Sequence, residues 1–133
     1  MTKIFADTFY FLALLNPRDA AHPRSVAVAR TIQGPLVTTA WVLTELADAM
    51  SAPENRREFI STLKDLRQNP AVIIVPPDPP LFEEGIQLFA NRPDKGWSLT
   101  DCISFVVMAK EDITEALTGD KHYEQAGFVA LLK

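Results

Sequence analysis

Short, unbroken apolar runs alternate along this chain with stretches whose apolar residues recur at helical spacing, and this alternation constrains the fold more than any other feature. The clearest run is Ala71–Val75, which has a proline on each side. A continuous apolar strand is buried on both faces, and such strands separated by helices are typical of a parallel sheet covered by helices. The sequence therefore predicts an α/β protein, a three-layer α/β/α sandwich with a central, mostly parallel sheet.

Proline, glycine and capping residues give the expected ends of these elements. Strands are expected at residues 4–6, 36–39, 71–75, 116–118 and 128–130, and helices at 9–15, from 23 to a stop at 34, and at 40–50, 56–68, 81–90 and 101–110, with a helical turn at 122–126. The chain has 133 residues, 47% of them hydrophobic, which is enough for one core. With no internal repeat or linker-like tract, residues 1–133 are expected to form a single domain.

Charge and cysteine content exclude several classes of protein. A formal net charge of −4 argues against a protein that coats nucleic acid by bulk attraction, but it is compatible with a nuclease whose clustered acids lower the total. The single cysteine, Cys102, excludes an internal disulfide and a cysteine-based zinc cluster, and we expect it to be a packed core thiol. No apolar stretch reaches the roughly 18 residues of a membrane span, and no signal-peptide pattern opens the chain, so a cytoplasmic protein without a membrane partner is expected.

Four acidic residues lie within or next to segments that should be buried: Asp7, Glu45, Asp101 and Asp120. Burying an ionised carboxylate without a partner costs several kcal/mol or more, and no lysine or arginine adjoins the first three in sequence. Ligands of parallel sheets collect at the carboxyl ends of the strands. Asp7 and Asp120 each follow an expected strand, and Asp101 lies near the start of a helix. Glu45 lies one turn into another helix, from which its longer side chain can reach the same edge, so all four are expected to converge on one point.

A cluster of carboxylate oxygens suits Mg²⁺ or Mn²⁺, and an ion held there could activate a water and stabilise the leaving oxygen of a phosphodiester. The sequence thus predicts that the four acids are metal ligands of a catalytic site. The alternative interpretation gives each acid a local role. Asp7 and Asp101 could cap helices, and Asp120 could be a turn residue. Glu45 has no such role in the middle of an expected helix.

These acids and their neighbours resemble the motifs of the PIN-domain family, in particular the VapC type of toxin ribonuclease. The resemblance is carried by Ile4–Thr8, Thr38–Leu46, Ser98–Phe105 and Thr118–Phe128, in the family's order and over nearly the whole chain. One departure is Tyr123, where the family pattern suggests phenylalanine, and it is expected to matter little.

The resemblance implies a metal-dependent endoribonuclease in a single PIN-like domain, with RNA as substrate. It also implies homodimerisation and inhibition by a small antitoxin encoded alongside. It places Asp7, Glu45, Asp101 and Asp120 at the metal site, with Thr8, Ser98 and Thr118 as supporting residues. An independent argument for self-association is that the expected first helix, residues 9–15, is apolar nearly all round.

Basic residues that could contact RNA phosphates occur in two places. On the expected helix 56–68, Arg56, Lys64 and Arg67 fall on one arc, and Arg92 and Lys95 lie in the loop before the third acid. A plain solvated surface is the alternative interpretation of both. His122 follows the fourth acid, and we expect it to be a surface turn residue rather than a contact of substrate or of a carboxylate.

Other functions remain open at this stage. They are a non-toxin PIN-like nuclease, another Mg²⁺-dependent phosphohydrolase, or a metal-binding regulatory α/β module without catalysis. A haloacid-dehalogenase type of phosphatase would have a second aspartate two residues after the first, where this chain has Phe9. A receiver-like module would have an acidic pair ahead of its phosphorylated aspartate and a late lysine, and that set is not found here.

Overall fold

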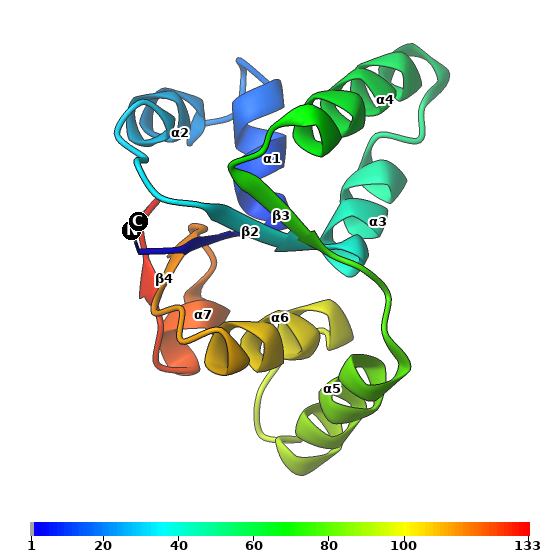
Figure 1. The fold of residues 1–133 in the computed structure, drawn as a ribbon, viewed down its shortest axis with the longest axis vertical. Helices are drawn as coiled ribbons and strands as arrows, with labels where there is room; N and C mark the ends of the chain where they lie inside the picture. Colours follow the sequence, from blue (N-terminus) through cyan, green and yellow to red (C-terminus); the bar gives the residue numbers. More distant parts are fainter. Residues whose placement is uncertain (1) are drawn as a thin grey trace.

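A parallel five-stranded sheet forms the centre of the molecule in the computed structural model, which describes residues 2–133 (Figure 1). The strand order is β3-β2-β1-β4-β5, and every neighbouring pair is parallel. The strands are β1 Ile4–Ala6, β2 Leu36–Thr39, β3 Val72–Val75, β4 Glu115–Leu117 and β5 Val129–Ala130. The predicted α/β architecture is confirmed, with a sheet that is wholly parallel among the described residues.

Seven helices in the described part of the chain cover the two faces of the sheet. They are α1 Thr8–Leu15, α2 His22–Ala29, α3 Ala40–Ala49, α4 Pro53–Gln68, α5 Pro79–Asn91, α6 Leu99–Lys110 and α7 Lys121–Gln125. Figure 1 shows α1 to α4 on one side of the strands and α5 to α7 on the other. No helix within residues 2–133 is long and apolar enough to cross a membrane.

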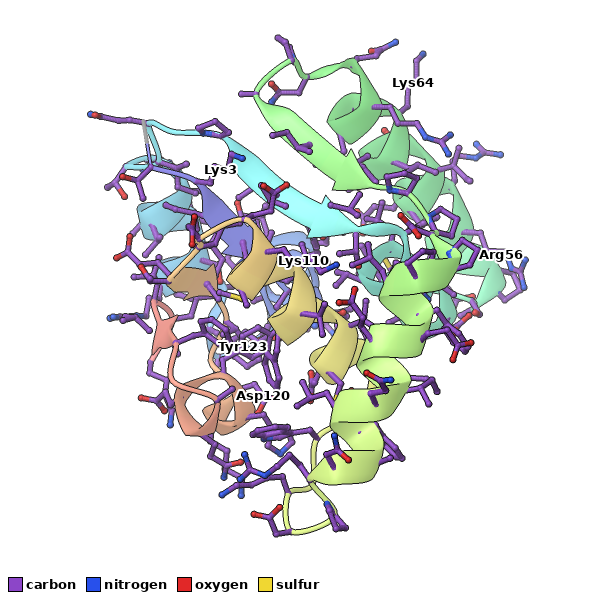
Figure 2. All side chains as sticks on the ribbon, turned by 60° about the horizontal axis from the view of Figure 1, so that its bottom comes forward. Lys3, Arg56, Lys64, Lys110, Asp120 and Tyr123 are labelled. Atoms are coloured by element: carbon purple, nitrogen blue, oxygen red, sulfur yellow. The ribbon has the colours of Figure 1, made fainter. Side chains whose placement is uncertain are left out.

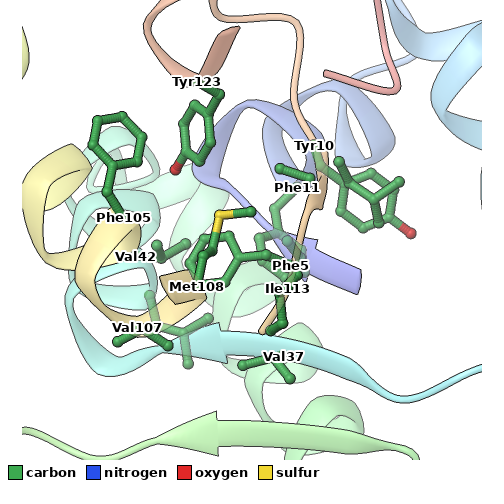
Figure 3. Packing of buried hydrophobic residues seen from close by; sticks show 14 of the residues in the cluster. Phe5, Tyr10, Phe11, Val37, Val42, Phe105, Val107, Met108, Ile113 and Tyr123 are labelled. Carbon is green, nitrogen blue, oxygen red and sulfur yellow. The ribbon is translucent and has the colours of Figure 1, made fainter. Parts of the chain in front are cut away.

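The core surrounds the central strand β1. Phe5 and Val37 are fully buried, and Figure 3 shows them close to Met108 and Ile113, which come from α6 and from the segment between α6 and β4. β1 lies between β2 and β4, and both run parallel to it. The residue directly after β1 therefore lies at the carboxyl edge of the sheet, between the ends of these two strands, and it is buried. That residue is Asp7.

Two expected helix starts were wrong because a proline opens each helix. α4 begins at Pro53 rather than after a cap at Asn55, and α5 begins at Pro79 rather than Leu81. Proline is favoured at the first helical position, where its fixed φ suits the helix and its missing N–H is not needed. α2 ends at Ala29, earlier than expected.

The first helix does not offer the exposed apolar surface that its composition suggested. Its half-buried residues, Phe9, Leu12, Leu14 and Leu15, pack against the core, and the helix contacts both α2 and α3. Being covered on more than one side explains why it is apolar nearly all round. The exposed large apolar side chains lie elsewhere: Ile60, Ile73, Phe82, Ile86, Phe89 and Val129.

Candidate active site

The four predicted acids line one pocket of about 370 Å³ at the carboxyl edge of the sheet. Asp7 directly follows β1, Glu45 lies in α3, Asp101 lies in the first turn of α6, and Asp120 precedes α7. The four residues come from opposite faces of the sheet and from both ends of the chain. They meet because the carboxyl ends of β1, β2 and β4 are adjacent.

Asp7 is the most deeply placed of the four and is 5% exposed. Thr118 Oγ1 donates a hydrogen bond of 2.9 Å to Oδ2 of Asp7, and the Tyr123 hydroxyl donates one of 3.0 Å to Oδ1. Burial raises the pKa of Asp7 to about 6 although both hydrogen bonds lower it, and the charge of Asp101 adds to the rise. Asp7 occupies the N-cap position of α1 but makes no side-chain cap hydrogen bond, so its carboxylate has no capping role.

Asp101 and Asp120 do have local capping roles. Ser98 Oγ accepts from the Asp101 N–H (3.0 Å) and Asp101 Oδ2 accepts from the Ser98 N–H (3.2 Å), which forms a capping box at the start of α6. Asp120 Oδ1 accepts from the His122 N–H at 2.9 Å. Burial raises the pKa of Asp101, as does the charge of Asp120, against the lowering effects of Ser98 and His122. Capping fixes both carboxylates where they line the pocket.

His122 lies between these two acids, so its expected place as a surface turn residue was wrong. Its Nδ1 is 3.1 Å from Asp101 Oδ2 and 3.2 Å from Asp120 Oδ1, and its side chain is 23% exposed. Potential ligand atoms of the three residues all lie within 4.8 Å of one another. The cause is the short helix α7, which starts directly after Asp120 and turns the chain back over the pocket.

Glu45 reaches the pocket from α3 and is held by Thr8. The Thr8 hydroxyl donates to Glu45 Oε1 at 2.5 Å. Each of the three predicted supporting residues is thus hydrogen-bonded to an acid, since Ser98 bonds Asp101 and Thr118 bonds Asp7. Apart from these residues, Asp120, His122 and Gly96, the wall of the pocket is apolar and is formed by Phe9, Leu12 and Ala49.

Tyr123 is a site residue that the sequence interpretation set aside. Its ring is fully buried and packs edge-on to Phe105, with the ring centroids 4.9 Å apart. Burial and the charge of Asp7 raise the pKa of Tyr123 well above its ordinary value, so the hydroxyl stays protonated and donates to Asp7. The sequence held one indication of this role: a tyrosine hydroxyl at a position where a phenylalanine ring would suffice for packing.

The basic residues expected to contact RNA do not line the pocket. Arg56, Lys64 and Arg67 are exposed on α4, and Figure 2 shows the first two far from Asp120. Arg92 and Lys95 are nearer in the chain, in the loop that leads to the pocket residue Gly96. The Arg92 guanidinium pairs with Asp94 at 3.0 Å and lies over the Trp97 ring at 5.1 Å.

The donor set fits a divalent cation. Carboxylate oxygens crowd one pocket, burial and mutual repulsion raise two of their pKa values, and a cation would relieve that repulsion. Hard ions such as Mg²⁺ and Mn²⁺ prefer oxygen ligands of this kind. Cys102 is fully buried in the core cluster, as expected for a packing residue.

The chain is similar in sequence to the PIN domain family and to a known endonuclease. The model of the PIN domain family matches residues 4–129. A protein described as the 23S rRNA-specific endonuclease VapC20, from two strains of Mycobacterium tuberculosis, is 26% identical over 126 residues, which are 95% of this chain and 95% of that protein.

Two solved structures have the same fold as this chain. The crystal structure of Mycobacterium tuberculosis VapC20, described as a sarcin-ricin loop cleaving toxin, superposes with a TM-score of 0.87 at 25% identity, covering 95% of this chain and 96% of that one. The structure of FitAcB from Neisseria gonorrhoeae superposes with a TM-score of 0.68 at 22% identity, covering 96% and 94%. The second likeness concerns the fold alone.

Proposed function

Because the chain belongs to the PIN-domain family, we propose that it is a metal-dependent endoribonuclease, the toxin of a toxin–antitoxin pair, acting on RNA in the cytoplasm as a single domain. The observation that carries the proposal is the convergence of Asp7, Glu45, Asp101 and Asp120 in one pocket. The likeness to VapC20 over 95% of both chains supports the toxin type.

Asp7, Glu45, Asp101 and Asp120 would hold Mg²⁺ or Mn²⁺. A divalent ion in such a site lowers the pKa of an attacking water and stabilises negative charge on a phosphodiester. The protein's part is to fix the acids. Asp7 is held at both oxygens, Glu45 by Thr8, and Asp101 by the capping box, so little reorganisation is needed when substrate binds.

Cleavage assays test the proposal. The chain is incubated with structured RNA, ribosomal RNA included, with Mg²⁺ or Mn²⁺ and with excess EDTA. We expect cleavage that the chelator abolishes and that Asp101→Asn removes. The matched control is Asp65→Asn, which changes an exposed acid of α4 that does not line the acidic pocket. Equal cleavage with and without chelator would contradict the metal mechanism.

We also propose a homodimer, with α5 as its contact. Phe82, Ile86 and Phe89 recur at helical spacing on α5 and are 40%, 36% and 50% exposed. Exposed apolar side chains gathered on one helix face are typical of an interaction surface. Light scattering is expected to give twice the chain mass, and Ile86→Glu is expected to give the monomer. A monomeric unaltered chain at tens of micromolar would contradict this.

An antitoxin protein is the second proposed partner. A cavity of about 580 Å³ lies between α3, α4 and β3, and its lining is mainly apolar, with Leu43, Phe59, Leu63 and Ile74 among its residues. It could receive an apolar segment of such a protein, and Arg67 is among the residues that line it. Co-expression with the product of the neighbouring gene, followed by purification of the tagged chain, is expected to yield a complex that Leu63→Asp disrupts.

A further inference from the structure

His122 carries the only side-chain nitrogen among the described residues that line the acidic pocket. We propose that Nδ1 of His122 is a direct ligand of the divalent ion, beside Asp101 and Asp120. The inference rests on the proposed function, because it needs a metal in this pocket. It adds a ligand of different chemistry to a set otherwise made of carboxylates.

The first argument is spacing. Neighbouring ligands of an octahedral ion with bonds of about 2.1 Å are about 3.0 Å apart. Nδ1 of His122 lies 3.1 Å from Asp101 Oδ2 and 3.2 Å from Asp120 Oδ1. The nitrogen and each of the two oxygens therefore already have the separation of adjacent metal ligands, and little movement is needed for all three to bind one ion.

The second argument is that the backbone holds the imidazole in this place. The His122 N–H donates to Asp120 Oδ1 at 2.9 Å, and the Asp120 N–H donates to Thr118 Oγ1 at 3.1 Å. Thr118 in turn bonds Asp7, so α7 is tied to the deepest acid of the pocket. A ligand that is positioned before the ion arrives loses little conformational freedom on binding.

A nitrogen ligand changes which metal is preferred. Mg²⁺ favours oxygen ligands and keeps its waters, whereas Mn²⁺ and the later divalent metals accept imidazole, with affinities that rise along the series. The protein is therefore expected to bind Mn²⁺ and Co²⁺ more tightly than Mg²⁺. A rival arrangement leaves His122 as a hydrogen-bond donor to the two carboxylates, with oxygen ligands alone around the metal.

Electron spin echo spectroscopy of the full chain loaded with Mn²⁺ distinguishes the two arrangements, because a coordinated imidazole nitrogen modulates the echo. The sequence has two histidines, which provides a matched control. His22 does not line the pocket, and its Nδ1 contacts the backbone oxygen of Ala13 at 2.8 Å. Nitrogen modulation is expected in the unaltered chain and in His22→Gln, and is expected to be lost in His122→Gln.

Calorimetric titration adds a second measurement. His122→Gln is expected to weaken Mn²⁺ binding by at least about tenfold and to weaken Mg²⁺ binding less. The preference of the protein for Mn²⁺ over Mg²⁺ should therefore become smaller in this variant. Bound Mn²⁺ without nitrogen modulation in the unaltered chain would overturn the inference, and RNA cleavage by that same sample would show that the proposed function survives it. If the unaltered chain neither binds Mn²⁺ nor cleaves RNA, both the inference and the proposed function are overturned. The spectrum of the unaltered chain requires no variant to fold.

Discussion

The acidic pocket and the basic face of α4 both gather charge, but they hold it in different ways. Every acid of the pocket has a named hydrogen-bond partner, and Asp7 has one on each carboxylate oxygen. The α4 cations are exposed, and Arg56 bonds only a backbone oxygen, that of Ser51, at 2.7 Å. Fixed charges can stabilise a transition state, whereas exposed flexible ones contribute attraction that salt screens. We therefore expect chemistry from the pocket and at most binding from α4.

The largest expected effect concerns Glu45, which has no structural role as a cap. Glu45→Gln should lower single-turnover RNA cleavage by more than about a hundredfold. The proposed role of Glu45 is that of a direct metal ligand, and losing such a ligand should cost more than the 10- to 100-fold typical of an outer-shell partner. Asp48→Asn is the matched control, since Asp48 is exposed on the same helix and does not line the pocket. A comparable loss in both variants would mean that the charge of the helix matters rather than the pocket.

The next effect is on stability and concerns Tyr123. Tyr123→Phe keeps the buried ring but removes the donor to Asp7. Leaving a buried carboxylate short of a donor should lower the free energy of unfolding by about 2 kcal/mol at pH 7. Urea denaturation in metal-free buffer measures this. The loss should shrink at pH 5, where Asp7 is mostly protonated, and an equal loss at both pH values would point to packing instead.

A smaller effect is the pH dependence of the metal-free protein. Burial raises the pKa of Asp7 from 3.8 to about 6, so the unfolded chain loses this proton at lower pH than the native one. Stability from this group therefore falls as pH rises from about 4 to 6 and stays low above that. Between pH 5 and pH 7 the free energy of unfolding should drop by about 1 kcal/mol through Asp7.

Comparison with Asp7→Asn isolates that contribution. The variant should lack this part of the pH dependence, keep its stability at pH 7 or gain some, and lose cleavage. Thermal melts in EDTA at several pH values make the measurement. A strongly destabilised Asp7→Asn at pH 7 would show that the carboxylate holds the fold together rather than being strained by burial.

The smallest expected effect on turnover belongs to α4. Replacing Arg56, Lys64 and Arg67 by alanine should leave cleavage of bound RNA within about twofold, because none of the three lines the acidic pocket, and Figure 2 shows Arg56 and Lys64 far from Asp120. RNA binding should weaken, and its dependence on salt should become shallower, since fewer counterions are released. An unchanged salt slope would make α4 plain solvated surface and direct attention to Arg92 and Lys95.

Local patterns in the sequence were sufficient to predict most strands and helices and to predict that the four acids lie close together. Unbroken apolar runs such as Val72–Val75 indicated buried parallel strands, and parallel strands share a carboxyl edge, so acids placed after them had to be neighbours. Helix starts at Pro53 and Pro79 were misplaced because proline both ends and begins helices.

The sequence by itself determined the class of fold and four acids that could share one site, because apolar runs, helical spacing and capping depend on residues close together in the chain. Only the tertiary structure decided that His122 lies between Asp101 and Asp120, that the Tyr123 hydroxyl reaches Asp7, and that the α4 cations do not line the acidic pocket. Those facts depend on the strand order and on how helices cross the sheet. Contacts between residues more than 100 positions apart, such as Asp7 and Tyr123, leave no periodic trace in a single sequence.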